Sequence, residues 1–149
     1  MNIINMDQNE FYEFRRELNE QVKAIHIPED INPMLGKMII SQIDELYTRI
    51  RLDLVDIENG VNRVESTIRE WERSKASGSS DTQRKKNATE ALQNYDTGDG
   101  GTVNMYDVQR SFINRENSLK AILDTLSNKQ NRLVTITGLL KLDKELTSF

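Results

Sequence analysis

The sequence predicts an elongated all-α protein, and three observations carry that prediction. Only two prolines and seven glycines interrupt 149 residues, so most of the chain must lie in long regular elements. Apolar residues recur three and four positions apart over two long stretches, which is the period of an α-helix. Hydrophobic residues make up 36% of the chain and charged residues 30%. That balance suits long helices, because each buries one stripe and exposes the rest.

The composition also excludes several kinds of chemical site and predicts where the protein is found. The chain has no cysteine, which excludes disulfides, thiolate metal sites and cysteine nucleophiles. No apolar run reaches the roughly 20 residues of a membrane span, and the first ten residues are polar rather than signal-like. We therefore expect no membrane contact and a cytoplasmic protein. The net charge of −4 argues against a protein that coats duplex DNA by charge alone.

The first two predicted helices are separated by a proline-containing loop. The first helix spans residues 7–25 and can be capped by Asp7. Pro28 and Pro33 disfavour helix in the residues that precede them. The second helix spans residues 34–75 and carries a continuous apolar stripe at helical spacing. Its stripe consists of Ile39, Ile43, Leu46, Ile50, Leu54, Ile57, Val61, Val64, Ile68 and Trp71.

Two further helices follow, each after a break. The third is short, spans residues 81–94 and begins after the small-residue segment 76–80. A glycine-rich segment separates it from the final helix, residues 104–146. At 1.5 Å per residue, the second and fourth helices are each roughly 60 Å long. We expect these two helices to pair as an antiparallel, coiled-coil-like hairpin within a single elongated domain over residues 1–149.

The final helix contains a heptad of large apolar residues. Every seventh position is apolar from Met105 through Phe112 to the four leucines that follow, whereas the interleaved seam contains Arg115, Lys129 and Asp143. Charged residues in a seam can set register or partner choice. We therefore predict a homo-oligomer. An intramolecular bundle, in which the charged side chains reach solvent, is the alternative. The predicted oligomer seam is Leu119, Leu126, Leu133 and Leu140.

No motif in the chain predicts catalysis, a cofactor, a metal or a small-molecule substrate. The segment 96–107 begins and ends with Asp like a calcium loop, but Gly98 and Gly100 occupy two ligand positions and Asp107 replaces the usual Glu. A glycine-rich turn is the better interpretation. His26 is the only histidine, and no serine or cysteine nucleophile can be assigned to it. We expect no enzyme activity.

Basic residues gather on both sides of the small-residue segment 76–80. Several such residues can neutralise phosphates, and the nearby Trp71 can stack on a base. Trp71 also falls on the apolar stripe of the second helix, which favours a core role. The competing interpretation is a solubilising surface whose bases are offset by neighbouring acids. The basic residues are Arg63, Arg69, Arg73, Lys75, Arg84, Lys85 and Lys86.

The order of these features over residues 40–145 resembles that of the UvsY-like recombination mediators of tailed phages. A long helix ends in Arg69-Glu-Trp-Glu-Arg-Ser-Lys75, a small-residue break follows, and Arg84-Lys-Lys86 precedes a long C-terminal helix. Ala76-Ser-Gly78 stands where that family has an aromatic-glycine motif. The resemblance implies ring-like assemblies that bind single-stranded DNA and help to load a RecA-type recombinase. It implies DNA contacts by Arg69, Arg73, Lys75, Arg84, Lys85 and Lys86.

We therefore expect a non-enzymatic, phage-type accessory protein of DNA metabolism in the cytoplasm of a bacterial host. It would bind single-stranded DNA and a recombinase as an oligomer. The alternative is a protein that acts through protein–protein contacts only: a virion component, scaffold, chaperone or small inhibitor. Convergence of the basic side chains on one exposed surface favours DNA binding, whereas scattered bases paired with acids favour the alternative.

Overall fold

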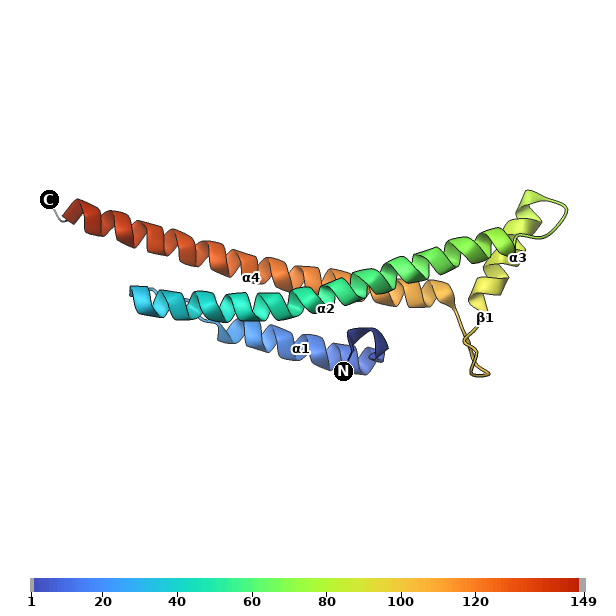
Figure 1. Ribbon diagram of the computed structural model, residues 1–149, viewed down its shortest axis with the longest axis horizontal. Coiled ribbons are helices and arrows are strands. Elements are labelled where there is room, and N and C mark those ends of the chain that lie inside the picture. The colour runs from blue at the N-terminus through green and yellow to red at the C-terminus, as the bar shows by residue number, and fades with distance from the viewer. Residues whose placement is uncertain (1, 148–149) are drawn as a thin grey trace. The chain divides into compact units, whose positions relative to one another are not determined.

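The computed structural model describes residues 2–147, and most of these residues are helical. The prediction of a helical fold is confirmed, and each predicted helix end lies within one residue of the observed one. No helix in residues 2–147 is both long enough and apolar enough to cross a membrane. The elements, drawn in Figure 1, are η1 (Ile3–Asn5), α1 (Gln8–Ala24), α2 (Pro33–Ser74), α3 (Asp81–Gln93), β1 (Tyr95–Asp96), β2 (Thr102–Val103) and α4 (Met105–Thr147).

The chain divides into two compact units. Unit 1 is built from the residues up to Leu54 and from Ser118 onward, and unit 2 is Val55–Asn117. Both α2 and α4 contribute residues to each unit. The single elongated domain expected from the sequence stays a prediction.

Side-chain caps fix where the first two helices begin. The carboxylate of Asp7 accepts a hydrogen bond from the Glu10 backbone N–H, and the carboxylate of Glu10 accepts one from the Asp7 N–H, both at 2.8 Å. This reciprocal pair satisfies two N–H groups at the start of α1. Asn32 accepts from the Leu35 N–H at 2.8 Å, and Pro33 then supplies the first residue of α2. Proline suits that position because its missing N–H has no helical partner there.

The core of unit 1 is formed by the apolar stripes of its helices. In Figure 1, α1 runs alongside the first half of α2. Lys129 on α4 donates a hydrogen bond to the backbone oxygen of Ile25 at 2.7 Å, and Gln130 donates one to Asp44 at 3.4 Å. The fully buried side chains of unit 1 are Ile3, Leu18, Ile43, Ile50, Leu54, Leu119, Leu126 and Leu133.

The core of unit 2 is a smaller cluster. Val64, Ile68, Leu92 and Met105 are buried together, and Trp71 packs against them. Throughout α2 the predicted stripe is confirmed, because every member from Ile39 to Ile68 is buried.

A short antiparallel hairpin in unit 2 was not predicted from the sequence. Tyr95 pairs with Val103 and Asp96 with Thr102. Gly98 and Gly100, at φ +83° and +89°, make the turn between the strands. Strands of two residues are too short to show the alternation by which a strand is recognised in a sequence.

Candidate nucleic-acid interface

The residues predicted to contact DNA lie at the end of α2 and on α3, all within unit 2. Lys75 places its ammonium group 4.9 Å from the ring centroid of Trp71, and the same ring meets Tyr95 edge-on at 4.8 Å. Trp71 is half-buried and packs on the unit 2 core, so the core role predicted for it is confirmed. Part of its ring remains accessible beside an exposed lysine.

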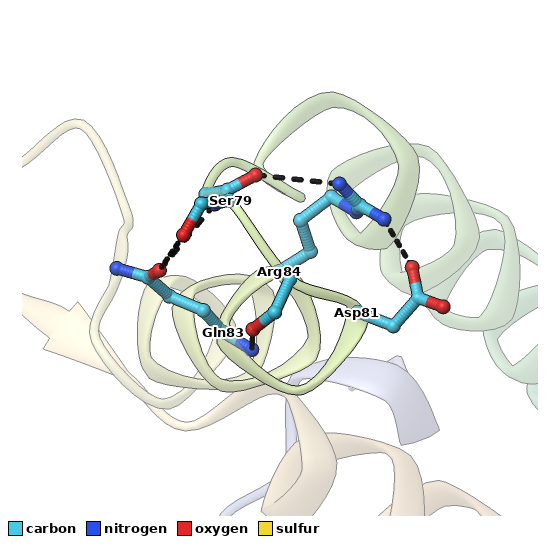
Figure 2. A network of polar contacts seen from close by, with 6 residues as sticks. Ser79, Asp81, Gln83 and Arg84 are labelled. Atoms are coloured by element: carbon cyan, nitrogen blue, oxygen red, sulfur yellow. Dashed lines mark hydrogen bonds and ion pairs between the residues drawn. The ribbon is translucent and has the colours of Figure 1, made fainter.

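A polar network orders the connection between α2 and α3 (Figure 2). Ser80 caps α3 by accepting from the Gln83 N–H at 3.2 Å, and the Gln83 side chain accepts from the Ser79 hydroxyl at 3.1 Å. Arg84 donates to the backbone oxygen of Gly78 at 3.3 Å and forms an ion pair with Asp81. The small-residue segment between the two helices therefore has defined hydrogen bonds.

Glycine is needed at position 78 of this connection. Its φ of +136° is unfavourable for a residue with a side chain. A Cβ atom there would also lie 2.8 Å from the Gln83 side chain.

The six predicted contact residues differ in their partners. Arg84 pairs with Asp81, and Lys86 lies 4.0 Å from Glu90. Within residues 2–147, the side chains of Arg69, Arg73 and Lys85 form neither a hydrogen bond nor an ion pair. Among the six predicted contact residues, those with acidic partners are thus confined to α3, whereas Arg69 and Arg73 on α2 are exposed and have no acidic partner in residues 2–147.

Helix geometry divides these residues among several faces. Arg69 and Arg73 are one turn apart on α2 and are exposed, so they form one outward face, away from the buried Ile68. Arg84, Lys85 and Lys86 are consecutive, and three consecutive helical residues spread over about 200°. The three bases of α3 therefore do not share one face.

A shallow depression between the end of α2 and α3 has mixed charge. Its volume is about 500 Å³, and its basic residues Arg84 and Lys85 are matched by Glu72 and Asp81. Phosphates would meet both signs of charge there. The complete lining is Glu72, Ala76, Asp81, Arg84, Lys85, Ala88 and Thr89.

Tyr106 engages one of these acids, which the sequence did not reveal. Its hydroxyl donates to the Glu72 carboxylate at 3.3 Å. Burial raises the pKa of Tyr106, and the negative charge of Glu72 raises it further. The phenol therefore stays protonated and keeps donating to Glu72 at neutral pH.

The predicted oligomer seam lies largely inside one chain. Leu119, Leu126 and Leu133 are fully buried in unit 1, and only Leu140 is exposed, at 43%. The seam charge Lys129 is satisfied by the Ile25 backbone oxygen. These three leucines therefore pack in the core of one chain, as in the intramolecular alternative. The seam charges do not all reach solvent as that alternative expected, because Arg115 is buried, at 5% exposure.

The carboxylates of the calcium-like segment stabilise its turn. Asp96 accepts from the Gly98 N–H at 2.8 Å, and Asp99 accepts from the Gly101 N–H at 3.0 Å and from the Thr97 hydroxyl. The hydrogen bonds from Thr97 and Gly101 lower the pKa of Asp99. In residues 2–147, no three acidic or histidine side chains are grouped as metal ligands.

A second surface feature, in unit 1, was not predicted from the sequence. A half-open groove of about 480 Å³ lies between the start of α2 and the end of α4. It combines apolar walls with three lysines, and we call it the lysine-rimmed groove. Its lining residues come from distant parts of the sequence, so no local pattern reveals it. They are Ile31, Asn32, Pro33, Gly36, Lys37, Ile40, Thr137, Leu140, Lys141 and Lys144.

Comparisons with protein-family models, curated proteins and solved structures gave no match.

Proposed function

We propose that this protein is a non-enzymatic accessory protein of DNA metabolism whose unit 2 binds single-stranded DNA. The observation that carries the proposal is the outward face of α2, where Arg69 and Arg73 are exposed one turn apart without acidic partners. Lys75 lies 4.9 Å from the ring of Trp71 on the other side of α2, because Trp71 is about 160–200° around the helix from the two arginines. Proteins that bind single strands usually place positive side chains along the nucleic-acid backbone and aromatic rings where bases can stack.

The ion pairs on α3 do not prevent Arg84 and Lys86 from contributing. Both pairs are solvent-exposed, and exposed pairs contribute only about 0–1 kcal/mol. A phosphate can therefore replace the carboxylate at small cost. Over residues 69–86 the chain has six bases and three acids, which gives this segment a net positive charge within an acidic protein.

We further propose that α2 and α4 pair as an antiparallel hairpin and that several copies assemble around DNA and a recombinase. Contacts within unit 1 support the antiparallel order. Gln130 donates a hydrogen bond to Asp44, and Ile40 and Leu140 line the same groove. A position nearer the start of α2 thus lies beside a position nearer the end of α4. Repetition of a weak DNA site in an assembly raises the overall affinity by effective concentration.

A second candidate function is an assembly protein, such as a virion component, scaffold or chaperone, that binds only other proteins. Two observations favour it. Glu72 and Asp81 lie beside Arg84 and Lys85 in the depression. The bases of α3 also point to different sides, and Arg84 and Lys86 are paired with acids, which is the pattern expected of this alternative. In that case the exposed bases keep the protein soluble and have no ligand.

Fluorescence anisotropy of a labelled single-stranded oligonucleotide distinguishes the two functions. Binding at about 50 mM salt that weakens steeply at about 200 mM is expected, because each neutralised phosphate releases counterions. No binding at the lower salt concentration, with protein at tens of micromolar, would leave the protein-binding function.

A further inference from the structure

The end of α4 carries two different surfaces on opposite sides of the helix. One side lines the lysine-rimmed groove with Thr137, Leu140, Lys141 and Lys144. At about 100° per residue, Leu139, Leu142 and Leu146 project from the other side. These three leucines, which we call the outer stripe, are 61%, 53% and 66% exposed.

The outer stripe has the spacing of a helix–helix contact. Its leucines are three and four residues apart, which is the pattern by which one helix packs against another. Large apolar side chains exposed together on a helix mark an interaction surface more often than single ones do. The core of this chain does not cover them.

The charges of the two surfaces are complementary. Three of the groove's ten lining residues are lysines, and none is acidic. The outer stripe is flanked by acids, with Asp143 along one edge and Glu145 along the other. A helix that packs these leucines against the apolar residues of the groove therefore brings its carboxylates to the lysines of the groove.

We infer that the outer stripe of one copy docks into the lysine-rimmed groove of a second copy. Leu139, Leu142 and Leu146 would cover Ile40 and Leu140, and Asp143 would approach Lys37 and Lys141. The inference deepens the proposed self-assembly and assigns it to residues that, apart from Leu140, lie outside the predicted leucine seam.

The contact is head-to-tail. Because the two surfaces lie on opposite sides of α4, a copy that donates its outer stripe still has an empty groove for the next copy. Such heterologous contacts form a ring if the rotation closes and a filament if it does not. A small patch of three leucines predicts weak association that depends on protein concentration.

Sedimentation velocity without DNA, from about 10 to 300 µM protein, tests the contact with two variants. The stripe variant is Leu139→Glu/Leu142→Glu, and the groove variant is Lys37→Glu/Lys141→Glu. All four residues are exposed, so the helical circular dichroism should be unchanged. A control with the same charge change as the groove variant, Lys23→Glu/Arg132→Glu, alters exposed residues elsewhere in unit 1.

The wild type and the control should form progressively larger species, and each variant alone should remain monomeric. An equimolar mixture of the two variants should give a one-to-one dimer and nothing larger, because only one intact stripe and one intact groove can meet. Self-association of the groove variant would show that stripes pair with each other, and would overturn the inference. A wild type that stays monomeric, or a mixture that does, would also overturn it. None of these outcomes depends on DNA binding, so the proposed DNA contact is tested separately.

Discussion

Lys75 lies over the indole ring of Trp71, with its ammonium nitrogen 4.9 Å from the ring centroid. The same ring meets Tyr95 edge-on at 4.8 Å and packs on the buried cluster of unit 2. The only tryptophan in the chain thus packs on the core of unit 2 and has Lys75, one of the proposed DNA contacts, over its ring. An ammonium group over an indole contributes about 0.5–1 kcal/mol when exposed, so packing dominates the role of Trp71.

Replacement of Trp71 separates these roles. Trp71→Ala should lower the free energy of unfolding by about 2–3 kcal/mol. This is somewhat less than the same substitution costs at a fully buried site, because the ring is half-buried. Trp71→Phe keeps an aromatic ring against Tyr95 and should lose much less. Urea unfolding followed by circular dichroism measures both. An alanine variant as stable as the wild type would show that the ring does not support the core.

The leucine heptad gives a second prediction. Leu126→Ala should lower the free energy of unfolding by about 3 kcal/mol, because it leaves a cavity in a fully buried site. Leu140→Ala, at an exposed position of the same heptad, should cost less than about 1 kcal/mol. Equal effects in thermal or urea unfolding at low protein concentration would contradict the placement of Leu126 in the core of one chain.

The turn between β1 and β2 should respond to acid. Since hydrogen bonds from Thr97 and Gly101 lower the pKa of Asp99 below 3.8, they stabilise the turn above that pH. Their contribution is lost as the pH falls through the lowered pKa. Thr97→Val removes the first donor and should move the pKa of Asp99 back toward 3.8. An NMR titration of the Asp99 carboxyl group in the wild type and in the variant measures the change. An unchanged Asp99 titration would exclude the Thr97 hydrogen bond as the cause.

Local periodicity made the helices predictable, but it could not assign their partners. The stripe from Ile39 to Ile68 is buried throughout α2, because a sustained helical period has few other structural solutions. The sequence pattern of the heptad containing Leu126 is the same whether a second copy or the same chain covers that leucine. Only the fold shows that the chain's own core takes Leu126.

Surface features formed by segments distant in sequence could not be predicted. The lysine-rimmed groove is lined by both Lys37 and Lys141, and no local stretch of sequence contains both. The run Arg84-Lys-Lys86 looked like one basic patch, yet helix geometry directs its members to different sides. Their acidic partners Asp81 and Glu90 lie three and four residues away, which a helical spacing rule could have found.

DNA binding by the outward face of α2 is best tested with paired charge-reversal variants. Arg69→Glu/Arg73→Glu should lower the affinity for a labelled single-stranded oligonucleotide about tenfold or more. It should also reduce the slope of log affinity against log salt by about 0.7 for each phosphate that the protein no longer neutralises. The control Lys23→Glu/Arg132→Glu makes the same change in net charge in unit 1 and should leave the slope unchanged. Equal losses of affinity in both variants would mean that only the overall charge of the protein matters, and would contradict a DNA site on α2.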